Sequence, residues 1–100
     1  MNRALTPTGG ARLLLERAGE AGAGEYRAAI YTPGATYEGH AALREDGSAD
    51  VDIAGAPAEL ADALRMLAKL TARAAPSRRA EGLPVWPARV LRWRGPGRGG

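Results

Sequence analysis

The chain has 100 residues, of which 45% are apolar and 25% are charged, and its formal net charge is +3. This length suits one domain with one core, and the composition excludes wholesale disorder. The absence of cysteine excludes disulfide bonds and thiolate metal sites. No apolar stretch approaches the roughly 20 residues that span a membrane, and residues 1–7 lack the apolar run of a signal peptide, so we expect a cytoplasmic protein.

The charge is unevenly distributed along the chain. Up to residue 72, seven basic residues stand against ten acidic ones, whereas from Arg73 onward seven arginines accompany Glu81 alone. Such an asymmetry is typical of contact with nucleic acid or another polyanion. A competing interpretation is compositional, because a GC-rich genome produces the same abundance of Ala, Gly, Arg and Pro whatever the function.

The first thirty residues predict a lead-in followed by a strand. Residues 1–10 contain Thr-Pro-Thr-Gly-Gly and predict a flexible N-terminal lead. Residues 11–18 form a short apolar run that fits either a strand or the start of a helix. We favour a strand, because the glycine-rich stretch 19–24 is typical of a turn that leads into further strands.

Three segments alternate apolar and polar side chains with the period of a β-strand: residues 25–32, 36–44 and 48–53. Thr32-Pro33-Gly34-Ala35 between the first two predicts a type II turn, in which the glycine has a positive φ. Glu45-Asp46-Gly47-Ser48 predicts a hairpin turn. Together these segments predict an antiparallel β-meander of three to four strands, with one apolar face and one face in water.

A single amphipathic helix is expected after the meander. Pro57 suits the first position of a helix, and Glu59 suits its first turn, where a carboxylate complements the helix dipole. Pro76 is expected to end the helix. Apolar side chains recur between them at helical spacing, at Leu60, Ala63, Leu64, Leu67, Leu70, Thr71 and Ala74. This stripe is expected to cover the apolar face of the meander.

The C-terminal quarter predicts a linker and one more strand. Residues 76–84 are expected to form an exposed linker, and residues 88–94 alternate again, which predicts an edge strand. Leu91 and Trp93 share one face of this strand, and we expect them to pack in the core, whereas Trp86 is harder to place. The fold class is therefore α+β, with a meander covered on one face by one helix.

The expected domain organisation is simple. A single α+β domain spans residues 11–94, and residues 95–100 predict a disordered Gly/Arg tail. The sequence contains no arrangement that predicts a catalytic, cofactor or metal site. His40 is expected to be an ordinary surface histidine, because neither a nucleophile nor a second ligand accompanies it. Asp50 and Asp52 are expected to lie on the solvated face of a strand.

One group of residues suggests a binding function, namely the mixture of arginine and tryptophan near the C-terminal end. Guanidinium groups neutralise phosphates, and indoles offer faces on which bases stack. The candidate contacts with nucleic acid or a protein partner are Arg78, Arg79, Trp86, Arg89, Arg92, Arg94 and Arg98.

Three hypotheses for the function follow. The first is a non-enzymatic structural or interaction domain that self-associates, as a homodimer, because the core is thin and a sheet edge is available. The second is a single-stranded nucleic-acid-binding protein that uses the basic C-terminal segment. The third is an adaptor whose basic tail orders on a protein partner. An enzyme ranks last, because catalysis needs convergent polar groups.

Overall fold

The computed structural model describes residues 10–20 and 22–94. The first nine residues of the predicted lead 1–10, the predicted tail 95–100 and the candidate Arg98 lie outside the described residues.

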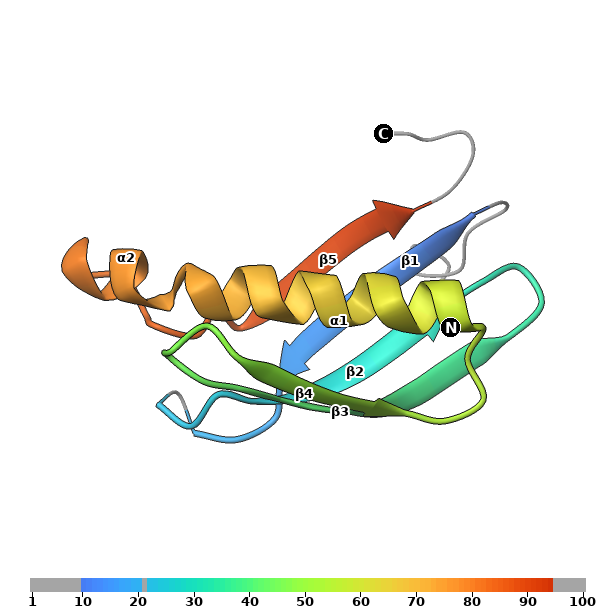
Figure 1. Cartoon of the computed structure of the whole chain (residues 1–100), viewed down its shortest axis with the longest axis horizontal. Helices are drawn as coiled ribbons and strands as arrows, with labels where there is room; N and C mark the ends of the chain where they lie inside the picture. Colours follow the sequence, from blue (N-terminus) through green and yellow to red (C-terminus); the bar gives the residue numbers. More distant parts are fainter. Residues whose placement is uncertain (1–9, 21, 95–100) are drawn as a thin grey trace.

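The described residues form a five-stranded antiparallel sheet with one long helix across one face (Figure 1). The strand order is β4-β3-β2-β1-β5. The elements in chain order are β1 (Ala11–Arg17), β2 (Glu25–Tyr31), β3 (Thr36–Leu43), β4 (Ala49–Ile53), α1 (Ala58–Arg73), α2 (Ala75–Ala80) and β5 (Arg89–Arg94).

The α+β class, the meander and the C-terminal edge strand are confirmed. The first apolar run is a strand, β1, and strands β1 to β4 follow one another as neighbours in the sheet. β5 then returns to the free side of β1, where it pairs antiparallel with Leu14 opposite Leu91. The sheet thus has two edges, formed by β4 and β5.

Both predicted turns occur, but the prediction of a type II turn is wrong. Thr32 N–H donates to the Ala35 carbonyl at 2.8 Å, which closes the first turn. Gly34 is not among the glycines with a positive φ, which the third residue of a type II turn requires. In the second turn Gly47 has a φ of 93° and Arg44 N–H donates to the Ser48 carbonyl at 2.9 Å.

The helix begins one residue later than expected, and its buried stripe is rotated. Pro57 occupies the N-cap position, just before α1. Leu70 is exposed and Leu60 is only partly buried, although both belong to the predicted stripe. The residues that α1 buries are Ala61, Leu64, Leu67, Ala68, Thr71 and Ala72. Three of these six are alanines, and small side chains let the helix approach the sheet closely.

The prediction of a linker over residues 76–84 is wrong for its first half. A second helix, α2, begins directly after Ala74 and continues to Ala80. Pro76 lies in the first turn of α2, where a backbone N–H would have no acceptor within the helix, so proline is tolerated there. Pro76 therefore separates two helices rather than ending helical structure.

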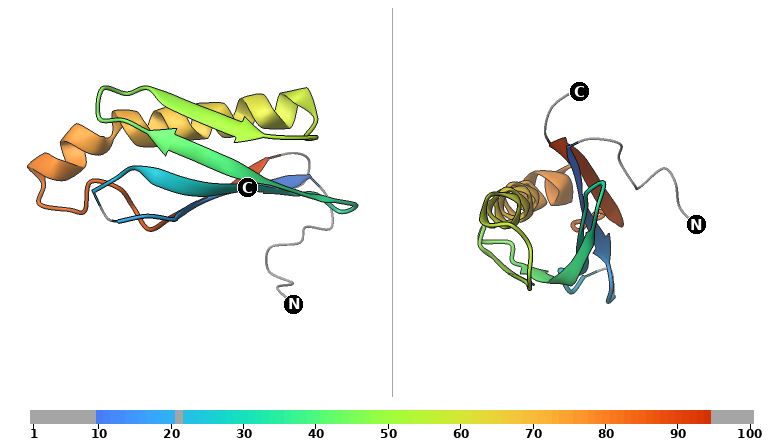
Figure 2. Two further views of the ribbon diagram at one scale, coloured as in Figure 1. Left: turned by 90° about the horizontal axis from the view of Figure 1, so that it is seen from below. Right: turned by 90° about the vertical axis from the view of Figure 1, so that its right-hand side faces the viewer.

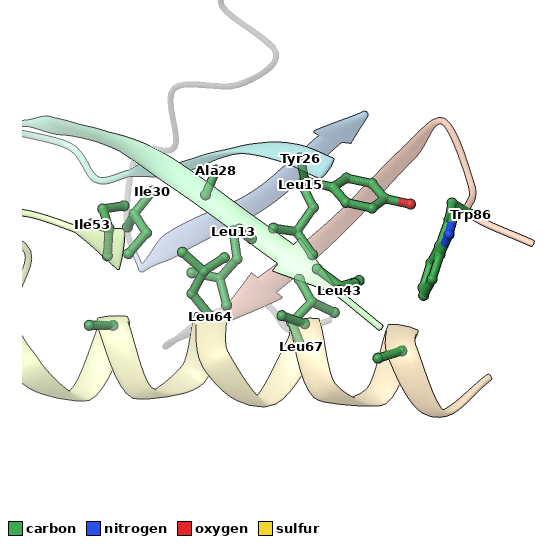
Figure 3. Close-up of a cluster of buried hydrophobic side chains, with 14 of the residues drawn as sticks. Leu13, Leu15, Tyr26, Ala28, Ile30, Leu43, Ile53, Leu64, Leu67 and Trp86 are labelled. Atoms are coloured by element: carbon green, nitrogen blue, oxygen red, sulfur yellow. The ribbon is translucent and has the colours of Figure 1, made fainter. Parts of the chain in front are cut away.

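The core lies between α1 and the concave face of the sheet (Figure 3). Leu13, Leu15 and Ile30 are fully buried against Leu64. Trp86 closes one end of this cluster, beyond the ring of Tyr26.

The expectation that Trp93 packs in the core is wrong. Trp86 is 2% exposed, whereas Trp93 is 38% exposed. The reason is the pairing of β5, which sets Val90 opposite Leu15 on the core side of the sheet. Successive side chains of a strand point to opposite faces, so Leu91 and Trp93 point away from the core.

The sheet curves around α1 (Figure 2). At one position on the sheet, two neighbouring strands lie so close together that only glycine fits. Gly39 in β3 lies opposite Ile53 in β4. A Cβ atom on Gly39 would lie 2.0 Å from the Asp52 carbonyl oxygen. A side chain at this position would force β3 and β4 apart. The short distance between these strands accompanies the packing of β4 against α1, which lies more closely on β4 than on the other strands.

Candidate interaction surface

β5 is one of the two edge strands of the described sheet. On its inner side β5 pairs with β1 over its whole length, from Arg89 opposite Glu16 to Arg94 opposite Ala11. On its outer side no strand among residues 10–20 and 22–94 pairs with it. An unpaired edge presents a row of free N–H and C=O groups, which is a template for a further strand.

Apolar side chains accompany this edge on the convex face of the sheet. Leu91 is 43% exposed, and it lies beside the buried Leu14 of β1, which in turn lies beside Ala29 of β2. Trp93 lies next along β5, opposite Arg12. The row Ala29-Leu14-Leu91 therefore leads outward to the free edge.

Arg12 and Trp93 form a cation–π contact on this face. The guanidinium carbon of Arg12 lies 4.3 Å from the centroid of the Trp93 ring. Arg12 Nε is buried and has no hydrogen-bond partner among the described residues. The pair holds the indole beside β5 and occupies one of its faces.

The charges on the convex face are mixed near β5 and acidic near β4. β1, β2 and β5 contribute three arginines and two glutamates, which are Arg12, Arg27, Arg89, Glu16 and Glu25. β3 and β4 contribute three carboxylates and one histidine, which are Glu38, Asp50, Asp52 and His40. This face therefore does not form a continuous basic surface.

The structure does not bring the sequence-predicted contact residues together. Arg89 lies on the convex face of β5, whereas Arg92 lies on the opposite face of the same strand. Arg94 belongs to the end of β5. The other three described candidates lie at or after α2, and they are Arg78, Arg79 and Trp86.

Those three residues are engaged within the chain itself. Arg78 Nε donates to the Pro84 carbonyl at 2.6 Å. Arg79 forms an ion pair with Glu45 at the β3–β4 turn, in which Nε donates to Oε1 at 3.1 Å. The Trp86 ring is buried and offers no face to a ligand. These contacts attach α2 and the following segment to the domain.

A groove that the sequence did not predict separates α1 from β5. Its volume is about 480 Å³. Met66 and Leu70 of α1 line one side of it, Arg92 of β5 lines the other, and Leu13 lies at its base. Met66 and Leu70 are both exposed, and Leu70 belongs to the stripe that was expected to face the sheet. The sequence carries no signal for this groove, because it depends on where β5 lies relative to the helix.

The segment that leads into β5 is fixed by two hydrogen bonds from the sheet. Arg17 Nη1 donates to the Trp86 carbonyl at 2.7 Å, and the Tyr26 hydroxyl donates to the Pro87 carbonyl at 2.6 Å. Burial raises the pKa of Tyr26 to about 12, and the nearby charges of Arg17 and Arg78 oppose this shift in part. The phenol is therefore neutral and able to donate at physiological pH. These bonds make the position of β5 well defined.

The remaining polar groups do not form a site. His40 is exposed, between Arg27 and Asp52 on the convex face. Hydrogen bonds from Ser48 hold the pKa of Asp46 below its usual value, which fits a turn carboxylate. Within the described ranges, no group of three His, Cys, Asp or Glu side chains could hold a metal ion. No helix in that part of the chain is long and apolar enough to cross a membrane.

Comparison with known proteins yields no relative. The chain matches no family model, no curated protein and no solved structure.

Proposed function

We propose that this chain is a non-enzymatic interaction domain that self-associates as a homodimer through the β5 edge. The observation that carries the proposal is the combination of an open strand edge with the exposed apolar side chains of Leu91 and Trp93 beside it. Open edges in natural proteins are either paired or protected by charge, shortness or a covering element. A two-fold symmetric pair is the commonest way to close one.

The two edges of the sheet differ in their cover and in their apolar side chains. β4 contains Asp50 and Asp52, and α1 packs more closely on it than on the other strands. β5 carries three arginines, but it also exposes Leu91 and Trp93. Carboxylates along an edge disfavour the approach of a second acidic edge. This difference supports β5, rather than β4, as the contact.

The test is the mass of the chain in solution, measured by light scattering or sedimentation over a range of concentrations up to tens of micromolar. We expect the wild type to be dimeric there, and Leu91→Lys to shift the equilibrium toward the monomer, because a charge at the centre of the interface must be desolvated. The matched control is Leu83→Lys, since Leu83 is 46% exposed and lies in the segment after α2. A monomeric wild type would overturn the proposal.

Binding of single-stranded nucleic acid is the alternative, and it makes a different prediction. Its support is the basic character of the C-terminal sequence and the partly exposed Trp93 in contact with Arg12. It predicts quenching of tryptophan fluorescence by an oligonucleotide, and this quenching should weaken strongly between about 50 and about 200 mM salt. No quenching at either salt concentration would reject it, and the dimer proposal would be unaffected.

A further inference from the structure

The pattern of hydrogen bonds in the sheet determines which backbone groups of β5 are free. Ala18 N–H donates to the Glu25 carbonyl, so the even-numbered residues of β1 bond to β2. Arg17 N–H donates to the Ala88 carbonyl, so the odd-numbered residues of β1 bond to the even-numbered residues of β5. Because backbone groups alternate in direction along a strand, residues 89, 91 and 93 point their N–H and C=O groups toward the free edge.

We infer that two copies of the chain pair β5 with β5 antiparallel, with Leu91 of one copy directly opposite Leu91 of the other. This inference rests on the proposed function and specifies its contact. In this register Arg89 lies opposite Trp93 of the second copy, and the reverse pair is equivalent by symmetry. Each of these three pairs exchanges two hydrogen bonds, which gives about six in total. Residues 90 and 92, on the core side, lie opposite each other.

The neighbouring registers are less favourable. A shift of one residue per strand toward the C-terminus sets Arg92 opposite Arg92 of the second copy, and like charges directly opposite each other are destabilising. The equivalent shift toward the N-terminus sets Trp93 opposite Pro87, which has no N–H to donate. In the registers between these, an odd-numbered residue of one copy lies opposite an even-numbered residue of the other. The outward N–H and C=O groups of one strand then face backbone groups that are already hydrogen-bonded to β1. Only the Leu91–Leu91 register uses residues 89 to 93 fully without opposing two arginines.

The side chains on the convex face are complementary in the same register. The apolar row Ala29-Leu14-Leu91 meets its symmetry copy, so it becomes continuous across the two sheets. Arg12 already covers one side of Trp93. Arg89 of the second copy arrives beside the same indole from the other strand, which adds a second cation–π contact. The interface thus combines backbone pairing with an apolar centre.

The same symmetry fixes the position of the two helices. A two-fold axis through the Leu91 pair, perpendicular to the sheet, joins two five-stranded sheets into one and leaves both α1 helices on one face. The grooves beside β5 then lie next to each other across the axis, with Met66 and Leu70 of each copy on their outer walls.

Disulfide cross-linking tests the register, and the chain is suited to it because it contains no cysteine. Hydrogen-bonded antiparallel pairs have Cα atoms about 5.5 Å apart, which is within the usual range for a disulfide. We expect Leu91→Cys alone to form a covalent dimer under mild oxidation. Arg89→Cys and Trp93→Cys should each cross-link poorly alone but should cross-link when mixed, since residue 89 faces residue 93.

Two controls make the outcome decisive. Leu83→Cys has a similar exposure and should remain uncross-linked, and Arg92→Cys should cross-link slowly because residues 92 lie on opposite sides of the axis. Preferential cross-linking of Arg92→Cys would overturn the register. A dimer by light scattering that Leu91→Cys does not trap would overturn the β5 contact while self-association stands. A monomer at all concentrations would overturn the proposed function itself.

Discussion

The hydroxyl of Tyr26, at the start of β2, donates a hydrogen bond of 2.6 Å to the carbonyl oxygen of Pro87, two residues before β5. The two residues are 61 positions apart in the sequence. This bond connects a central strand to the segment that delivers the edge strand. It therefore contributes both to the stability of the core and to the position of the β5 edge.

Removing this hydroxyl should destabilise the fold. We expect Tyr26→Phe to lower the free energy of unfolding by about 1–3 kcal/mol, because the partly buried Pro87 carbonyl loses its hydrogen-bond partner. Denaturant unfolding followed by circular dichroism measures the change. Tyr37→Phe is the control, since no hydrogen bond from the Tyr37 hydroxyl occurs among the described residues. Equal stability of the two variants would contradict the role assigned to Tyr26.

The raised pKa of Tyr26 makes the stability depend on pH at the alkaline end. Its pKa is about 12 in the folded chain and 10.0 as the ordinary value, so the unfolded state loses its proton first as the pH rises. The contribution of Tyr26 is fully present below pH 10 and is lost as the pH rises toward 12. Unfolding curves over this range should show the loss in the wild type and not in Tyr26→Phe.

The two tryptophans should differ sharply when each is truncated. Trp86→Ala removes a buried ring from the end of the core and should cost about 3–5 kcal/mol. Trp93→Ala should cost much less in the monomer, because the ring is partly exposed and its chief contact is with Arg12. Chemical denaturation compares the two variants. A larger loss of stability for Trp93→Ala than for Trp86→Ala would contradict the assignment of Trp86 to the end of the core.

The closeness of β3 and β4 predicts a glycine requirement at one position. Gly39→Ala places a methyl group 2.0 Å from the Asp52 carbonyl oxygen, so the strands must separate. We expect destabilisation at or above the upper end of the usual ~1–3 kcal/mol for overpacking. Gly34→Ala is the matched control, because a Cβ there meets nothing within 4 Å. Similar melting temperatures for both variants would contradict the close approach.

Much of the fold is determined by local pattern in the sequence. The alternation over residues 25–53 and the Asp46-Gly47 turn specify antiparallel strands, because a strand buried on one face needs apolar residues at a period of two. The spacing of Leu60, Leu64 and Leu67 specifies a helix for the same kind of reason. These patterns are local, so they can be recognised in the sequence without knowing which segments pack against one another.

The candidate interaction surface depends on contacts between distant segments. The sequence of β5 allows either face to be buried, since Val90 and Leu91 are both apolar, and only its pairing with β1 decides that Val90 points inward. Trp86, which the sequence left unplaced, fills the core end because Arg17 and Tyr26 bind the carbonyls beside it. The same pairing exposes Trp93 and opens the groove beside α1.

What the sequence determined by itself is the order of the strands and the long helix, with α2 missed, and what the tertiary structure decided is which face of the last strand turns toward the core. The physical reason is that a strand with apolar residues on both faces has no periodic preference for either one. Its orientation is then chosen by the hydrogen-bond register with β1 and by the anchoring of residues 85–88. The candidate contact residues that the sequence singled out are therefore spread over both faces of β5, α2 and the segment between them.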